Sequence, residues 1–280
     1  MPERGRFILC ADDYGQDPAI SAGIVELAKV GRLSATSAMT TTARWPQDAV
    51  ALRALSDGIA VGLHLNLTHG TGLGPLDSLT VSRALPDVGR VIGLALRRRI
   101  DRTELAAEIH RQLDAFEAAM DMPPDHLDGH QHVHALPQIR GVVMAVLRAR
   151  YGERMILLRD PGDGLVAILG RGSVAKALTV AALTKGFRTQ AEQAGFLTNA
   201  GFSGFSPFDA RPYVTEFRSF LRHAGKRPMI MCHPGHAAGS DDPLTARRPQ
   251  ELRYLAEAAD LPDLVWHPKR GADGLVDWPS

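Results

Sequence analysis

The sequence contains few cysteines and almost no excess of one charge. Only Cys10 and Cys232 occur in 280 residues, and both lie in apolar stretches. A disulfide-stapled secreted domain would carry many cysteines at regular intervals, so we predict two buried thiols. Lys plus Arg number 32 and Asp plus Glu number 31. This balance leaves no broad basic field and argues against a nucleic-acid partner.

The sequence also lacks an apolar run that could span a bilayer. Residues 165–187 are rich in Ala, Leu, Val and Ile, but Arg171, Lys176 and Lys185 interrupt them. A membrane span needs about 20 apolar residues, so we expect a buried or surface-lying helix there. The first apolar run, 7–11, is too short for a signal peptide. We therefore predict a cytoplasmic protein without a transmembrane segment.

Short apolar runs alternate with longer helical patterns, which predicts parallel strands joined by crossover helices. With 45% hydrophobic residues, the chain can bury a sizeable core, and we predict one α/β domain over residues 1–280. Helices are expected at 20–30, from Thr103, and after Pro137. The expected strands are 6–11, 35–39, 59–67, 126–127, 155–158 and 229–232.

Two segments have the composition of irregular loops. Residues 70–89 are rich in Gly, Pro and Asp, and such a loop could cover an active site. Residues 199–207 contain several turn-forming residues and two phenylalanines. These phenylalanines either line a pocket or anchor the loop, and the sequence leaves both interpretations open.

Two adjacent carboxylates, Asp12 and Asp13, follow the first apolar strand. Nothing about core packing calls for them at that point. The alternative is a helix N-cap, because Asp is favoured there, but Asp17 before Pro18 already fills that position. We therefore predict a functional role for Asp12 and Asp13.

The strand at 61–67 has one polar face. Strict alternation places His64 and Asn66 opposite three leucines. In a barrel, residues near the carboxyl end of a strand point at the active site, which makes His64 a candidate metal ligand. A hydrogen-bonded histidine of the core is the alternative.

Residues 126–134 carry four histidines and one aspartate. If the strand persists, alternation sends all five side chains to one face. Imidazole is the commonest ligand of divalent transition metals, and this short spacing lets one segment supply both ligands and the groups that orient them. A solvated His-rich loop would not explain the intervening Asp, Gly and Gln. We predict metal binding or catalysis by this segment.

A fourth apolar strand, 229–232, ends at His233, which is a candidate proton donor. Cys232 could be proposed as a nucleophile beside it. Adjacent residues of a strand point to opposite faces, however, so this pair could not easily form a hydrogen bond. We therefore expect acid–base chemistry rather than cysteine catalysis, and the role of His236 stays open.

Four motifs together resemble those of the YdjC-like carbohydrate deacetylases, a family that includes chitooligosaccharide deacetylases and hopanoid-associated deacetylases. They are ADDYG at 11–15, GLHLNLT at 62–68, HLDGHQHVH at 126–134 and MCHPG at 231–235. They follow the family's order and span nearly the whole chain. The resemblance implies a distorted, TIM-like (β/α) barrel, with seven strands as one option, and a homodimer. It also implies one divalent metal, magnesium or zinc, at the carboxyl-terminal mouth of the barrel.

The resemblance further implies roles for individual residues. Asp13, His64 and His130 would bind the metal. By similarity to the wider metal-dependent polysaccharide deacetylases, Asp12 would be the general base, and His233 would protonate the leaving amine. Other polar residues of the motifs would orient the ligands or contact the substrate, namely Asn66, Asp128, His132 and His134.

The expected reaction is hydrolysis of the acetamide of an N-acetylated sugar, either a chitooligosaccharide or an N-acetylglucosaminyl glycolipid. The motifs cannot choose between these substrates. One alternative is a metal-dependent hydrolase of another bond, such as a phosphoester. The motifs contain no Arg or Lys and no Gly-rich phosphate cradle, which disfavours it. Another is a non-catalytic sugar- or metal-binding protein, which the presence of both Asp12 and Asp13 argues against.

Two variable segments place apolar and basic residues together. Arg97, Arg98 and Arg99 follow the apolar residues 91–96, and 165–187 is also apolar with scattered cations. This pattern is compatible with peripheral membrane contact or a lipid-bearing substrate. The alternative is a solvated arginine edge and ordinary helix packing.

Overall fold

The computed structural model describes residues 6–207, 211–239 and 242–279. Its strands form one sheet in which every neighbouring pair is parallel, in the order β6-β5-β4-β3-β2-β1-β8-β7. The strands are β1 (Ile8–Tyr14), β2 (Ala35–Ala38), β3 (Ala60–Leu65), β4 (His126–Gly129), β5 (Leu157–Leu158), β6 (Leu197–Thr198), β7 (Phe202–Ser203) and β8 (Met229–Cys232).

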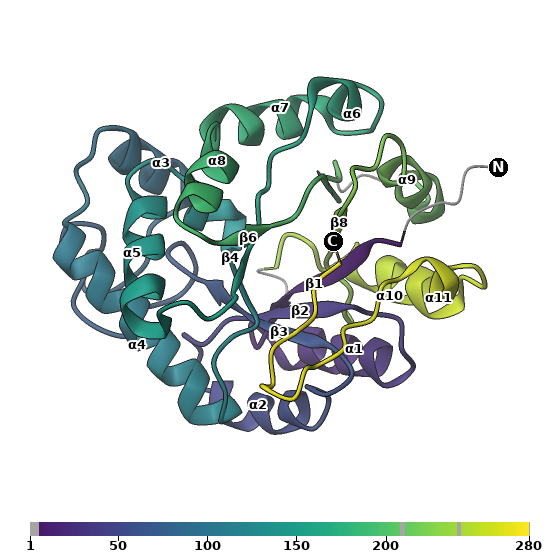
Figure 1. Cartoon of the computed structure of the whole chain (residues 1–280), viewed down its shortest axis with the longest axis horizontal. Coiled ribbons are helices and arrows are strands. Elements are labelled where there is room, and N and C mark those ends of the chain that lie inside the picture. Colours follow the sequence, from purple (N-terminus) through teal and green to yellow (C-terminus); the bar gives the residue numbers. More distant parts are fainter. Residues whose placement is uncertain (1–5, 208–210, 240–241, 280) are drawn as a thin grey trace.

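Helices surround the strands, which occupy the centre of the molecule in Figure 1. A short 3₁₀ segment, η1 (His130–Ala135), continues directly from β4. The helices are α1 (Pro18–Lys29), α2 (Trp45–Arg53), α3 (Val88–Leu96), α4 (Arg102–Met120), α5 (Ile139–Tyr151), α6 (Leu165–Leu169), α7 (Val174–Leu183), α8 (Phe187–Gln193), α9 (Tyr213–Phe220), α10 (Arg248–Glu257) and α11 (Leu261–Leu264).

The predicted distorted (β/α) barrel is confirmed. The sheet has eight strands, not the seven that the resemblance offered as one option. The sequence pattern did not predict β6 and β7, because each is only two residues long and gives no periodic signal. Within the described residues, no ladder joins β6 to β7, so hydrogen bonds do not close the barrel. The strands are parallel, so their carboxyl ends gather at one end of the sheet.

Local sequence signals set the first crossover. The Asp17 carboxylate accepts a hydrogen bond from the amide of Ala19, and Pro18 occupies the first helical position, as predicted. All seven residues of β1 are buried. Cys10 and Cys232 are free thiols in the interior, which confirms that prediction.

Residues 165–187 do not form one helix. Glycine-containing turns divide them into α6, α7 and the start of α8, and Gly186 has a φ of 80° that favours glycine. Within the described part of the chain, no helix is long and apolar enough to cross a membrane.

The two predicted loop segments pack on the body of the protein. In 70–89, the amides of Leu73 and Gly74 donate to the buried carboxylate of Glu108 on α4. In 199–207, Phe202 and Phe205 pack edge-on against the ring of His132. Phe202 belongs to β7, and both rings also line a small pocket, so the two phenylalanines anchor the segment and line a pocket as well.

Candidate functional site

All four sequence clusters meet in one cavity of about 410 Å³ at the carboxyl ends of the strands. Asp12 and Asp13 reach it from β1, and His64 reaches it from β3. Histidines that follow β4 and β8 join them, namely His130, His132 and His233, and further polar side chains of the lining include Lys176 and Arg248. The sequence-predicted candidates are therefore brought together by the topology.

A backbone irregularity lets two neighbouring carboxylates share this cavity. In a regular strand, Asp12 and Asp13 would point to opposite faces. Asp13 instead has a φ of 70°, and the register of β1 against β2 shifts between Ala11 and Tyr14. A bulge of this kind re-aims a side chain. Both carboxylates are almost completely buried.

Asp13, His64 and His130 form the set of side chains that fits a metal ion best. The Oδ1 atom of Asp13 lies 3.0 Å from Nδ1 of His130 and 3.4 Å from Nε2 of His64. Adjacent ligands of a metal held at about 2.1 Å are separated by roughly 3.0 to 3.4 Å. One carboxylate and two imidazoles also suit a divalent transition metal. As ligands of such a metal, these three side chains would leave coordination positions for water and substrate.

Asp128 orients His64. Its Oδ1 atom lies 2.6 Å from Nδ1 of His64, which leaves Nε2 directed at Asp13. Burial alone would lower the pKa of His64, but Asp128 and Asp12 raise it to about 10. The surroundings of this imidazole therefore stabilise positive charge, as a cation site requires. In metal sites, the ring nitrogen of a histidine that does not bind the metal commonly donates to a carboxylate, which fixes the orientation of the ring.

Arg159, which sequence reasoning missed, fixes Asp12. Its two terminal nitrogens lie 2.6 Å from the two carboxylate oxygens of Asp12, and Nη2 is also 2.5 Å from Asp128. The arginine side chain is fully buried. Arg159 comes directly after β5, as Asp12 comes directly after the apolar run 7–11. This position at the end of a strand could have identified Arg159 from the sequence.

A second arginine, Arg248 of α10, holds the other oxygen of Asp13. Its Nη2 lies 2.8 Å from Oδ2, and its Nε lies 2.7 Å from Asp242. Burial would raise the pKa of Asp13, but Arg248 and His130 hold it well below its usual range. The carboxylate is thus ionised, with Oδ1 left to face the two histidines.

The four motifs contain no Arg or Lys, but cationic side chains from other segments reach the site. Arg159 and Arg248 contact its carboxylates, and Lys176 of α7 lines the cavity. Both guanidinium groups are occupied by carboxylates, Arg159 by Asp12 and Asp128, and Arg248 by Asp13 and Asp242. They neutralise the acidic cluster instead of presenting free charge to a phosphate.

The alternation predicted for 126–134 is wrong, because the strand ends at Gly129. Gln131 and His132 have φ values of 52° and 62°, so the chain turns sharply after His130. His132 faces the aromatic rings of the 199–207 segment, whereas Nε2 of His134 lies 2.7 Å from the carbonyl oxygen of Arg159. Only His132 of these two lines the cavity.

Asn66 shapes the turn after β3. Its side-chain oxygen accepts hydrogen bonds from the amides of Thr68 and His69, and its nitrogen donates to Thr41 and to the carbonyl of His69. Thr68 and His69 both line the cavity. His236 lies at the surface, where its Nε2 is 2.7 Å from Glu26.

His233 lines the cavity opposite the histidines of β3 and η1. Burial lowers its pKa to about 4, against the opposing effect of Asp13 and Asp12. Its backbone amide donates to Oε2 of Glu251 at 2.7 Å. Burial also raises the pKa of Glu251 to about 7. Burial therefore favours the neutral form of the His233 imidazole.

Two further groups of ligand-type side chains lie deeper, Cys10 with His126 and Asp128, and Asp12 with His64 and Asp128. Arg159 contacts both groups, since it also lies 3.0 Å from Sγ of Cys10. A guanidinium already supplies the positive charge there. In the set of Asp13, His64 and His130, all three side chains line the cavity. Arg248 contacts Oδ2 of Asp13, whereas Oδ1 is the oxygen that faces the two histidines.

Apolar side chains form the outer walls of the cavity. They come mainly from α3, η1 and its exit, α7 and the segment before α10, and include Val88, Ile92, Leu136, Val180, Leu183 and Leu244. The site thus combines a polar, charged floor with apolar walls.

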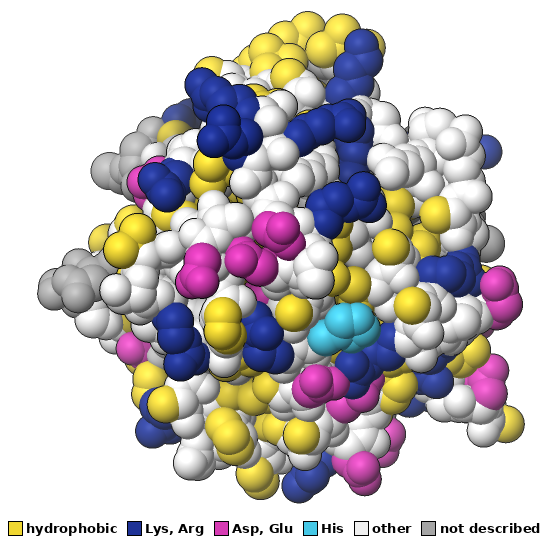
Figure 2. Space-filling model, turned by 90° about the vertical axis from the view of Figure 1, so that its left-hand side faces the viewer, with side chains coloured by type: hydrophobic (Ala, Val, Ile, Leu, Met, Phe, Trp, Pro, Cys, Tyr) yellow, Lys and Arg dark blue, Asp and Glu magenta, His cyan; other side chains and the backbone are white. Residues whose placement is uncertain are grey.

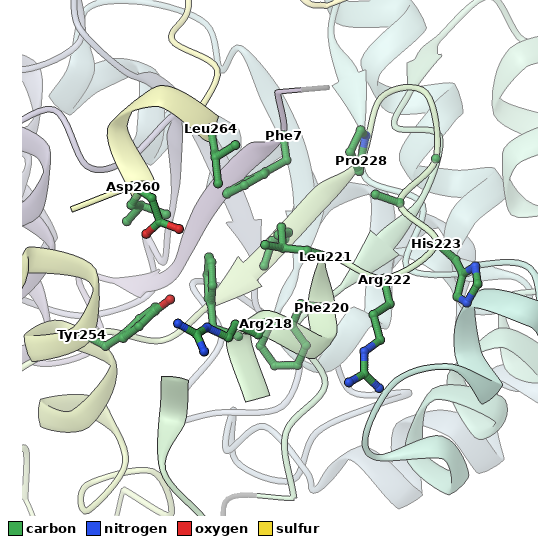
Figure 3. A pocket seen from close by; sticks show the side chains of 15 residues that line it. Phe7, Arg218, Phe220, Leu221, Arg222, His223, Pro228, Tyr254, Asp260 and Leu264 are labelled. Carbon is green, nitrogen blue, oxygen red and sulfur yellow. The ribbon is translucent and has the colours of Figure 1, made fainter. Parts of the chain in front are cut away.

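A second cavity, of about 870 Å³, lies near the amino-terminal ends of β1 and β8. Figure 3 shows Tyr254, Arg218 and Asp260 beside Phe7 and Leu264 around this space. It is lined by none of the candidate ligands, so it is separate from the site at the carboxyl ends.

Comparison with known proteins places the chain in a family. A chitooligosaccharide deacetylase of Yersinia pestis (strain Pestoides F) is 30% identical over 236 residues, covering 81% of this chain and 80% of that protein. A chitooligosaccharide deacetylase of Serratia marcescens is 35% identical over 148 residues, which cover 51% of this chain and 56% of that protein.

A solved structure from Enterococcus faecalis V583, provisionally described as a cellobiose-phosphate cleavage protein, has a TM-score of 0.69. It is 20% identical, and the match covers 91% of this chain and 92% of that chain, so the likeness concerns the fold alone. The family model of the YdjC-like proteins matches residues 6–260. With the four motifs and the barrel already described, the chain belongs to the YdjC-like family.

Proposed function

We propose that this protein is a metal-dependent deacetylase that hydrolyses the acetamide of an N-acetylated sugar. The observation that carries the proposal is the pair of neighbouring carboxylates with different partners. Asp13 faces two histidines, whereas Asp12 is held by Arg159 beside the same cavity. Amide hydrolysis needs these two functions side by side. The relatives named as chitooligosaccharide deacetylases support it.

In this proposal, Asp13, His64 and His130 hold one divalent metal, zinc or magnesium. When bound, such an ion polarises a carbonyl group and lowers the pKa of water. Asp128 keeps Nε2 of His64 directed at the site through its bond to Nδ1. Arg248 keeps Asp13 ionised, and it leaves Oδ1 available as the ligand atom.

Asp12 acts as the general base and accepts a proton from the attacking water. Arg159 fixes both of its oxygens and so sets the direction of the carboxylate. His233 acts as the general acid and donates to the nitrogen of the leaving amine. Because burial lowers its pKa to about 4, His233 must take up a proton during turnover, and the proton that Asp12 removes from water supplies it.

The cavity also fits the proposed substrate class. A volume of about 410 Å³ accommodates a small saccharide, and its polar floor lies where the acetamide would react. The apolar walls favour a substrate with a hydrophobic part. We therefore propose two substrates for testing, a chitooligosaccharide and an N-acetylglucosaminyl glycolipid.

The test is acetate release from N,N′-diacetylchitobiose and from an N-acetylglucosaminyl lipid, using protein stripped of metal and resupplied with zinc or magnesium. We expect release to depend on the metal and to fall by about 10²- to 10⁴-fold in D12N, which keeps the size but removes the base. The matched control is D17N, because Asp17 caps α1. D12N should still bind the metal.

Acetate release in D12N equal to that in D17N would remove the role of Asp12. Release of phosphate from a phosphorylated sugar, without acetate release from either substrate, would favour the phosphoester alternative. Metal binding without turnover of any substrate would favour a binding protein.

A further inference from the structure

Exposed apolar side chains are concentrated on three helices, α3, α6 and α7. Nine large apolar residues of the described chain are exposed by more than a third, and five of them lie on α3, α6 and α7. Three belong to the five residues of α6 alone. Exposed apolar clusters of this kind mark interaction surfaces. The five residues, called the apolar cap below, are Leu96, Leu165, Val166, Leu169 and Leu178.

The segments that carry the apolar cap contain no acidic residue. Residues 88–100 include four arginines and no Asp or Glu. Residues 164–191 include four cations and no Asp or Glu, but Arg171 and Arg188 pair with Asp163 and Asp160, and Lys176 lines the cavity. Arg97, Arg98 and Arg99 are all exposed directly after α3. In Figure 2, Lys and Arg side chains gather in the upper part of the molecule beneath an apolar summit, whereas most acidic side chains lie lower.

Two of these helices, α3 and α7, also line the reaction cavity, and α6 packs against α7. Val88 and Ile92 of α3 and Val180 and Leu183 of α7 line it, whereas Leu96 and Leu178 of those helices face solvent. A surface that covered the apolar cap would therefore lie next to the cavity mouth.

We propose that the apolar cap and Arg97–Arg99 are a docking surface for a bilayer that contains anionic lipid. Exposed apolar side chains insert into the headgroup region, and the cations are attracted to anionic headgroups. A second copy of the chain is a poorer partner, because a two-fold interface on this patch would bring one copy's basic segments near the other's. The proposal goes beyond the proposed reaction and does not require it.

The test is co-sedimentation of the whole protein with vesicles of phosphatidylcholine alone or mixed with phosphatidylglycerol. We expect binding to the mixed vesicles that weakens as salt is added. Each basic residue near such a surface contributes roughly fivefold in affinity, so R97Q/R98Q/R99Q should bind about 100-fold more weakly. V166D/L169D should also lose binding.

The matched control is V50D on α2, since Val50 is 59% exposed and Val166 is 70% exposed. These are surface positions, and unchanged thermal unfolding would verify that each variant folds. Equal sedimentation with both vesicle types would overturn the proposal, as would equal loss in V50D. A dimer by light scattering that dissociates in V166D/L169D would assign the apolar cap to a second copy instead. Acetate release in solution is a separate readout, so failure of either proposal is recognised independently.

Discussion

Two buried arginines determine what the neighbouring carboxylates of the cavity do. Arg159 holds both oxygens of Asp12 and also contacts Asp128, whereas Arg248 takes only one oxygen of Asp13. The first carboxylate is thereby fixed in direction, and the second keeps an oxygen for the histidines. The chemical difference between two identical side chains arises from their partners.

Replacement of Arg159 should therefore be costly. In R159M, two buried carboxylates lose their cation, and the free energy of unfolding should fall by about 3 to 5 kcal/mol. The control is R44M, because Arg44 pairs with Asp48 at 3.2 Å while its own side chain is 58% exposed. That pair should contribute at most about 1 kcal/mol. Urea unfolding measures both, and similar losses would contradict the assigned role.

Glu251 should make stability depend on pH. Burial raises its pKa to about 7 in the folded protein, whereas an unfolded chain has the ordinary value of 4.5. The folded state thus binds the proton more tightly, so this contribution is complete below pH 4.5 and is lost as pH rises toward 7. Between pH 5 and pH 8, the native chain should lose up to about 3 kcal/mol relative to E251Q.

Urea unfolding of the native chain and of E251Q at several pH values measures this difference. Comparison with E251Q cancels the titration of other groups, including His233, whose lowered pKa acts in the opposite direction. A difference between the two proteins that does not change with pH would show that Glu251 is ionised throughout.

At the scale of elements, the contact between β3 and β4 depends on a missing side chain. A Cβ atom on Gly62 would lie 2.3 Å from Nε2 of His126, whose ring fills the space between the strands. This histidine lies 3.0 Å from Ser37, which in turn donates to Asp128. The packing of two strands is thus connected to the residue that orients His64.

A methyl group at Gly62 should consequently displace His126. We expect G62A to lower the free energy of unfolding by about 1 to 3 kcal/mol through overpacking. G164A is the control, because a Cβ atom there meets no atom within 4 Å. Calorimetry or urea unfolding would measure both variants, and an unperturbed G62A would mean that the ring moves aside freely.

The sequence predicted those parts of the site that follow from strand periodicity. Apolar runs identified six of the eight strands, and polar residues at their ends pointed to Asp12 and Asp13, His64 and the 126–134 cluster. The choice of Asp13, His64 and His130 as ligands came from the family resemblance. The turn at Gln131 and His132 was not predictable, because residues in the left-handed region carry no distinct signature there. Arg159 and Arg248 were missed because they lie far along the chain from the carboxylates that they contact.

At the scale of the whole molecule, metal binding should stabilise the fold. An ion that binds only the folded state at 100 times its dissociation constant adds about 2.7 kcal/mol. Zinc or magnesium added to stripped protein should therefore raise the thermal midpoint by several degrees. H130A should lose this shift, whereas H236A should keep it, because His236 pairs with Glu26 at the surface. The same shift in both variants would place the metal elsewhere.

The left-handed backbone at Asp13 has a consequence for how such a site can arise or be rebuilt. A change in side-chain length cannot replace this backbone conformation, because the main chain sets the direction of each carboxylate. In a strand without this irregularity, Asp12 and Asp13 would point to opposite faces, and one carboxylate would enter the hydrophobic interior. Transfer of this chemistry to another barrel therefore requires grafting a main-chain shape, and the two acids alone would not suffice.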